Sequence, residues 1–239
     1  MIGSYIFHIQ SPEQIASSRA YAFYSCLLSL LPADYAEELH TQGETPISQC
    51  VYGEKSESFW RINLLDQPAN DIVTEVLDGL KVLPLHTGEL MLELQDRRKL
   101  SAEELMQTAR SIETERFFRL SFLSPTAFKQ AGRYTILPEK ELILQSLVNK
   151  WNTIFPEYPI EDEDAARMLS NGIRISDYRL RTTRFLMKDS KIPGFVGDLS
   201  IEAQLSAPIM ELWKMLIAVS EYSGIGIKTA LGMGGVKLG

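Results

Sequence analysis

The sequence has few cysteines and histidines, and it has no apolar run long enough to cross a membrane. Its 2 cysteines and 3 histidines are scattered over 239 residues, without the spaced pairs that are typical of a zinc site. The best apolar run, residues 23–33, is about half of the roughly 20 residues that a transmembrane helix needs. Residues 1–10 lack the basic start and cleavage pattern of a secretory signal. These absences predict a cytoplasmic protein with reduced thiols, without a membrane segment and without a metal site.

The two halves of the chain differ in charge. Residues 1–115 contain 8 basic and 18 acidic residues and residues 116–239 contain 16 and 13, so the halves carry −10 and +3, which sum to the net charge of −7. In the segment 167–191, seven basic residues outnumber two aspartates, and the net charge is +5. The basic residues are Arg167, Arg174, Arg179, Arg181, Arg184, Lys188 and Lys191. Because salt screens charges beyond about 8 Å, the acidic balance of the whole chain does not exclude an RNA partner at this segment.

Hydrophobic periodicity in the first half predicts the element order strand, helix, strand, strand, helix, strand. The predicted strands are residues 5–10, 48–52, 58–65 and 89–95, and the predicted helices are 19–31 and 70–80, with a short helical turn at 34–40. In the last strand, Leu90, Leu92 and Leu94 are expected to point inward. This order is that of a ferredoxin-like, or split βαβ, unit.

The same order returns in the second half. A helix at 101–111, which opens with a capping box of Ser101 and Glu104, is expected to link the halves. The strands predicted after it are residues 117–123, 134–137, 173–188, 195–205 and 236–238, and the helices are 139–155 and 208–222, with a short helix headed by 161–164. Residues 124–126 are expected to break the first strand, and Pro193 and Gly194 to turn between the two long ones. The predicted fold class is α+β, with tandem ferredoxin-like domains at residues 1–115 and 116–239 and a C-terminal glycine-rich loop.

That loop, residues 224–235, is called the glycine segment below. Its sequence, GIGIKTALGMGG, places five glycines around Lys228 and Thr229. Glycine allows positive φ and close approach of a backbone to a ligand, and amide groups together with a lysine suit phosphate binding. A glycine cap on the preceding helix, followed by a tight turn, explains the same composition. The G-x-x-x-x-G-K-[ST] and Rossmann glycine spacings are absent, which argues against a nucleotide enzyme.

Three motifs carry a resemblance to a known family. They are GIGIKTALGMG at 224–234, preceded by EYSG, then FLSPTAFKQAGRY at 122–134 and IPGFVGDL at 192–199. The glycine motif resembles that of the RAMP superfamily. The other two, with a histidine after the first helix, resemble the CRISPR repeat-processing endoribonucleases of that superfamily, in particular members that accompany type III systems.

The resemblance implies an enzyme that binds CRISPR repeat RNA in precursor transcripts. Family members cleave it without a metal or cofactor, by attack of a ribose 2′-hydroxyl on the adjacent phosphate, which leaves a 2′,3′-cyclic phosphate and a 5′-hydroxyl. At most transient association with a type III effector complex is expected, and both a monomer and a homodimer fit. The alternative is a non-catalytic RNA-binding RAMP subunit of an effector complex.

The resemblance also points to a catalytic histidine after the first helix, where His40 ends the short helical turn. A helix C-terminus favours a protonated imidazole, which suits a general acid for the leaving 5′ oxygen. The second catalytic residue is Tyr24 or Lys55. Tyr24 is explained equally well as an aromatic residue that packs the first helix, and Lys55 as a solvated turn residue. The other histidines, His8 in a strand and His86 in a loop, are expected to have no catalytic role.

RNA contacts are expected mainly from the second half. The basic strand and the turn after it resemble the basic hairpin that family members place beside the RNA, and the glycine segment resembles their RNA-contacting loop. The residues expected to bind RNA are Gly224, Gly226, Lys228, Thr229, Gly232, Gly234, Arg179, Arg181, Arg184, Lys188 and Lys191. Phe185 would share the face of Arg179 and Arg181 unless a bulge intervenes. The aromatic signature of RRM sheets is absent, so stacking of bases across the sheet is not expected.

Overall fold

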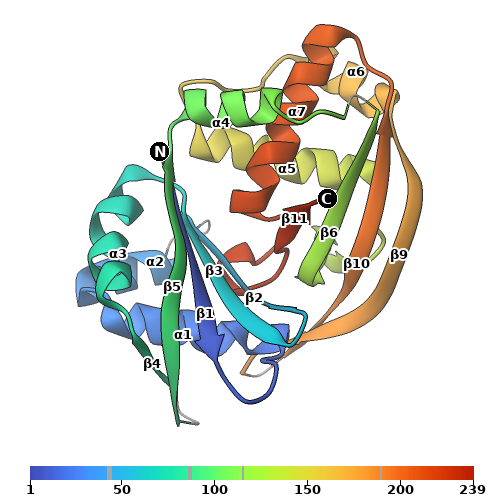
Figure 1. The fold of residues 1–239 in the computed structure, drawn as a ribbon. Coiled ribbons are helices and arrows are strands. Elements are labelled where there is room, and N and C mark those ends of the chain that lie inside the picture. Colours follow the sequence, from blue (N-terminus) through green and yellow to red (C-terminus); the bar gives the residue numbers. More distant parts are fainter. Residues whose placement is uncertain (42–44, 86–87, 115, 189) are drawn as a thin grey trace.

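The computed structural model describes residues 1–41, 45–85, 88–114, 116–188 and 190–239. His86 and Asp189, which entered the sequence predictions, lie outside these residues. The chain forms two antiparallel sheets, with α1 to α3 gathered around the first and α4 to α7 around the second (Figure 1). The predicted α+β class is therefore confirmed. No described helix has the length and apolar character needed to cross a bilayer.

The first sheet has the strand order β2-β3-β1-β5-β4. It consists of β1 (Ile2–Gln10), β2 (Ile47–Glu54), β3 (Glu57–Leu64), β4 (Val82–Leu85) and β5 (Gly88–Leu100). The turn η1 (Ser17–Arg19) and the helices α1 (Ala20–Leu30), α2 (Ala33–Thr41) and α3 (Gln67–Gly79) belong to the same half. Side chains alternate across a strand, so Tyr5, Phe7 and Ile9 of the central β1 all enter one core with α1 and α3. The four residues of β4 are too few to show a period, and sequence periodicity did not predict this strand.

One inward residue of β5 was predicted wrongly. Leu92 is buried, but the side chain of Leu94 is 41% exposed. Leu94 still lies opposite the core residue Phe7 in the pairing of β1 with β5. Because β4 pairs only with residues 88–91 of β5, Leu94 lies where β5 is the edge of the sheet, which explains its exposure.

The second sheet has the strand order β11-β6-β10-β9. It consists of β6 (Phe117–Thr126), β9 (Ile173–Leu186), β10 (Lys191–Ala203) and β11 (Val236–Leu238), and a separate hairpin is formed by β7 (Phe128–Gln130) and β8 (Arg133–Thr135). The helices are α4 (Ala102–Arg110), α5 (Lys140–Ile154), α6 (Glu163–Gly172) and α7 (Ala207–Ser223). Trp151 of α5 and Trp213 of α7 are fully buried in the second core.

Two segments of this half that were expected to interrupt or connect strands lie within strands instead. β6 continues through Pro125 to Thr126, which pairs with Phe195. Pro193 and Gly194 lie in β10, opposite Arg184 and Thr183 of β9. A proline is tolerated near the first residues of a strand, and a Cβ at Gly194 would lie 2.9 Å from the carbonyl oxygen of Thr126. The glycine therefore allows the neighbouring strand to approach, and the hairpin turn itself lies between Leu186 and Lys191.

Some side chains of the second half pack in the core of the first half. Phe185 of β9, fully buried, packs in the first core together with Ile192, Ala230 and Met233. No register shift separates Phe185 from Arg181, so the same face of β9 carries exposed arginines at one end and a core residue at the other. Because the expected boundary at residues 115 and 116 includes a residue outside the described ones, the two-domain division stays a prediction.

Candidate functional site: a cleft beside the glycine segment

The glycine segment begins where α7 ends and lies between the two sheets, in red after α7 in Figure 1. Gly224 caps α7 with a φ of 68°, and its amide donates to the carbonyl of Ser220 at 2.9 Å. The chain then turns through Lys228, which has a φ of 55°, into the 3-10 turn η2 (Thr229–Leu231). The amides of Leu231 and Met233 both donate to the carbonyl of Lys228, at 3.0 and 3.2 Å. Lys228 therefore sits at the tip of a tightly bonded turn.

The amides of the four glycines that were expected to bind RNA all donate to groups within the protein. Those of Gly226 and Gly234 donate to Ser146 Oγ at 2.8 Å and to the carbonyl of Pro125 at 3.0 Å. Gly224 and Gly232 likewise donate to carbonyls of the protein. A Cβ at Gly226 would lie 2.4 Å from the carbonyl oxygen of Ala127. These glycines therefore allow close packing of the segment, and we assign them this structural role.

Buried polar side chains of the first sheet bind the carbonyls of the segment and its flanks. The Gln49 amide donates to the carbonyls of Ala20 and Ala230, at 3.0 and 3.1 Å, and its oxygen accepts from Trp60 Nε1 at 3.0 Å. Arg61 donates to the carbonyl of Val236 at 2.6 Å, and Asn63 to that of Tyr222 at 2.7 Å. Because a buried carbonyl without a partner costs about 1–3 kcal/mol, these bonds fix the segment against the sheet.

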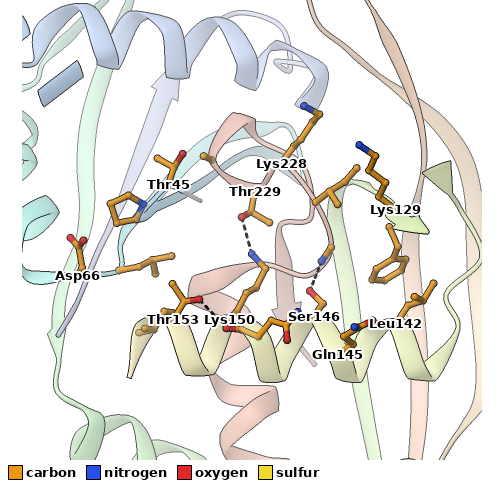
Figure 2. A pocket seen from close by; sticks show the side chains of 18 of the residues that line it. Thr45, Asp66, Lys129, Leu142, Gln145, Ser146, Lys150, Thr153, Lys228 and Thr229 are labelled. Carbon is orange, nitrogen blue, oxygen red and sulfur yellow. Dashed lines mark hydrogen bonds between the residues drawn. The ribbon is translucent and has the colours of Figure 1, made fainter. Parts of the chain in front are cut away.

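A cleft of about 770 Å³ lies beside the segment, with walls from both halves (Figure 2). The first half contributes Thr45, Pro46, Leu65 and Asp66, and the second contributes residues 226–230, the β7–β8 hairpin and one face of α5. That face consists of Leu142, Gln145, Ser146, Asn149, Lys150, Thr153 and Ile154, which follow the 3.6-residue period of a helix. Three lysines line the cleft, so its charge suits an anionic ligand.

The lysines of the cleft have different roles. Lys150 donates to Thr229 Oγ1 at 3.0 Å and to the carbonyl of Ser223 at 3.2 Å, and so helps to hold the segment. Lys228 and Lys129 are exposed and extend away from α5 (Figure 2). Thr229 is only 8% exposed, so we assign its hydroxyl to the contact with Lys150. Lys228 is the exposed cation of the segment that lines the cleft.

The three candidate catalytic residues lie in different surroundings. His40 is exposed in the last turn of α2, and the chain reaches the cleft wall five residues later, at Thr45. Tyr24 is 4% exposed in the first core. Burial raises the pKa of its hydroxyl, and a hydrogen bond to Thr45 opposes the rise. Lys55 has a φ of 56° in the turn after β2, about 25 Å along the strand from Thr45. The structure therefore does not bring Lys55 to the cleft.

Asp66 is a cleft residue that the sequence analysis did not single out. It caps α3 by accepting from the amide of Ala69 at 2.7 Å. Burial raises the pKa of this carboxyl, and the capping hydrogen bond opposes the rise. Only its position before the helix, with Pro68 at the start, was a sequence signal for a cap; its place in a cleft wall depends on packing between the halves.

The predicted basic surface follows β9 and its turn. The side chains of Arg179, Arg181, Arg184, Lys188 and Lys191 are all exposed. Two carboxylates on the neighbouring strand β10 already bind other arginines: Glu202 accepts from Arg116 at 2.8 Å, and Asp198 from Arg119 at 2.7 Å. The hydrogen bond from Arg119 holds the pKa of Asp198 below its usual value. Among the described residues, no group of three or more side chains is arranged to hold a metal ion.

Comparisons with known proteins identify relatives of similar sequence and fold. A family model described as CRISPR-associated endoribonuclease Cas6 matches residues 120–236. The CRISPR-associated endoribonuclease Cas6 of Streptococcus thermophilus is 34% identical over 234 residues, 98% of this chain and 96% of the relative. A Cas6 product complex is similar in fold, with a TM-score of 0.79, 21% identity and 100% of both chains covered. A Cas6 histidine-to-alanine mutant has a TM-score of 0.75 and 20% identity over 100% of this chain and 99% of its own.

Replacing Gln49 tests the anchoring of the glycine segment. Gln49→Leu roughly keeps the size of the side chain but removes the partner of two carbonyls and an indole N–H. Because each buried group without its partner costs about 1–3 kcal/mol, the free energy of unfolding should fall by about 3 kcal/mol or more. Urea denaturation measures this loss. The matched control is Gln14→Leu, because the Gln14 amide also donates to two carbonyls, at 3.3 Å, but is exposed. The control should change stability by less than about 0.5 kcal/mol, and equal losses in the two variants would contradict the anchoring role.

Proposed function

The chain belongs to the Cas6 family of CRISPR-associated endoribonucleases, and we propose that it cleaves CRISPR repeat RNA without a metal ion, by attack of a ribose 2′-hydroxyl on the adjacent phosphate. The observation that carries the proposal is the 34% identity to the Streptococcus thermophilus enzyme over 98% of the chain. The 2′-hydroxyl gives its proton to water as its oxygen bonds to phosphorus, and this oxygen stays bonded when the 5′ oxygen leaves with a proton. The products are therefore a 2′,3′-cyclic phosphate and a 5′-hydroxyl. A non-catalytic RAMP subunit is set aside, because the relatives are endoribonucleases.

In this proposal His40 is the general acid that donates a proton to the leaving 5′ oxygen. Its imidazole is exposed at the end of α2, and the chain that follows forms the cleft wall at Thr45. General acid catalysis typically contributes about 10²- to 10⁴-fold to a rate.

Tyr24 fits a positioning role better than proton transfer. Its raised pKa keeps the phenol protonated at neutral pH, whereas a base for the 2′-hydroxyl would have to be a phenolate. Its hydrogen bond to Thr45 instead connects α1 to the cleft wall. We therefore assign Tyr24 to the placement of Thr45 and give Lys55 no part in the reaction.

Phosphates of the RNA are bound in the proposal at two places. Lys228 supplies a cation at the tip of the glycine segment, inside the cleft. The exposed arginines of β9 and the lysines of its turn supply a second basic surface for the RNA outside the cleft. Cleavage of the bound repeat then yields guide RNA. Transient association with a type III effector complex stays a prediction, and a cleft built within one chain is compatible with a monomer and with a homodimer.

Cleavage in a chelator tests the reaction. The protein, incubated with the repeat RNA of its own locus in EDTA, should cut at one site and leave a 2′,3′-cyclic phosphate that mass spectrometry identifies. An RNA with a 2′-deoxy nucleotide before the scissile phosphate is the control and should stay intact, since it lacks the nucleophile. Cleavage that requires added magnesium, or that leaves a 3′-hydroxyl, would refute the proposed chemistry.

The role of His40 is tested by His40→Ala. Single-turnover cleavage should slow by about 10²- to 10⁴-fold, while binding of the 2′-deoxy-blocked RNA should stay within about twofold, because the imidazole acts on the leaving group. His8→Ala is the matched control: His8 lies in β1 with Nε2 3.7 Å from Glu57, away from the cleft lining. Its cleavage rate should stay near that of the unmodified enzyme. Near-normal cleavage by His40→Ala would remove the assignment.

A further inference from the structure

The β7–β8 hairpin is the part of the FLSPTAFKQAGRY motif that has no role so far. Its two central residues, Ala131 and Gly132, have positive φ angles of 45° and 80°, as in the tight two-residue turns that match the twist of a hairpin. The register pairs Lys129 with Tyr134. Directly opposed residues point to the same face, with Cβ atoms about 5 Å apart. The turn therefore places Lys129 and Tyr134 side by side on one face of the hairpin.

That face of the hairpin is turned toward the cleft. Lys129 and Tyr134 both line the cleft, and Tyr134 is 44% exposed although it is a large aromatic. Phe128 anchors the hairpin, since it is buried with its ring centroid 6.4 Å from that of Phe195. It is also bonded to the glycine segment, because the amide of Ile227 donates to the carbonyl of Ala127 at 3.0 Å. An exposed ring in so firmly held a position is suited to binding.

The wall formed by α5 adds polar groups of a different kind. Gln145 and Asn149 lie one helical turn apart on the face of α5 that lines the cleft, and both are exposed. A side-chain amide offers donors and an acceptor together, which matches the edge of a nucleobase. The cleft thus combines an aromatic face, amide groups and the cations of Lys129 and Lys228.

We propose that the cleft binds an unpaired nucleotide of the RNA, with its base stacked on Tyr134, a flanking phosphate at Lys129 and the base edge at Gln145 and Asn149. The inference rests on the proposed function and adds to it a site for one nucleotide, in which Tyr134 stacks on the base. Only an unpaired base exposes a face to a protein ring, and stacking on aromatic side chains is the usual way of binding one. The volume of about 770 Å³ lies within the range of small-molecule sites, about 300–1,000 Å³.

Binding of the 2′-deoxy-blocked repeat RNA to tyrosine variants tests the stacking. Tyr134→Ala should weaken binding by about 5- to 150-fold, whereas Tyr134→Phe should stay within about twofold, because the ring is retained. Tyr158→Ala is the matched control, since Tyr158 is 48% exposed and does not line the cleft; it should bind normally. Equal binding by all variants, or an equal loss in Tyr134→Phe, would overturn the stacking. Thermal unfolding followed by circular dichroism checks that each variant is folded.

The phosphate contact is tested by salt titration. Lys129→Ala should make the slope of log K against log salt shallower by about 0.7, the value for one phosphate of a single strand. Arg133→Ala is the control, because it removes the same charge from the same hairpin at a position that does not line the cleft, and its slope should not change. Equal changes in both variants would contradict a specific contact at Lys129.

A fluorescent base identifies the nucleotide. 2-Aminopurine, placed in turn at each unpaired position of the RNA, should be quenched by the unmodified protein at one position and recover its emission with Tyr134→Ala. Absence of such a position would overturn the inference. If the unmodified protein cleaves its repeat while Tyr134→Ala binds normally, the inference fails and the proposed function stands. If the unmodified protein neither binds nor cleaves the repeat, both fail.

Discussion

Hydrogen bonds from buried side chains of β2 and β3 to the backbone of the glycine segment are the constraint on which the site depends. Gln49, Arg61 and Asn63 are buried in β2 and β3, and they donate to carbonyls of Ala230, Val236 and Tyr222. Polar groups in a sheet core are costly without partners. The buried side chains of the first sheet and the carbonyls of the segment therefore satisfy each other's hydrogen bonds. These bonds fix the two halves relative to each other at the cleft.

From the opposite side, α5 completes the hold on the segment. Ser146 and Lys150 bind it through a backbone amide and through Thr229, so the segment is clamped between a sheet of one half and a helix of the other. Lys228, at its tip, is thereby presented to the cleft from a rigid turn. A preorganised cation stabilises the charge that develops on a phosphate without the cost of reorganisation during the reaction. The glycines contribute by admitting neighbouring backbone, and the lysine contributes the charge.

The sequence allowed the α+β class and the element order to be predicted, because alternation and helical periods are local properties. It failed where distant residues decide. The amide of Gly226 donates to Ser146, 80 positions away. Composition indicated a free amide that could bind phosphate, because it does not show which distant residue accepts the hydrogen bond. Pro193 and Gly194 are typical turn residues, so the sequence predicts a turn. They fit within β10 because of the close approach of the neighbouring strand, which the sequence does not show. Likewise, the motif containing Tyr134 was visible in the sequence, but its partners in the cleft come from α5 and the glycine segment.

Photo-cross-linking tests most directly whether RNA is cut where the glycine segment meets the first half. A 2′-deoxy-blocked repeat RNA with 4-thiouridine beside the scissile phosphate would be irradiated with the protein, and mass spectrometry would locate the cross-linked peptides. Cross-links are expected at the end of α2 near His40, at the cleft wall around Thr45, and at residues 226–230. Cross-links confined to β4, β5 or α6, with none at the cleft, would contradict the placement of the reaction.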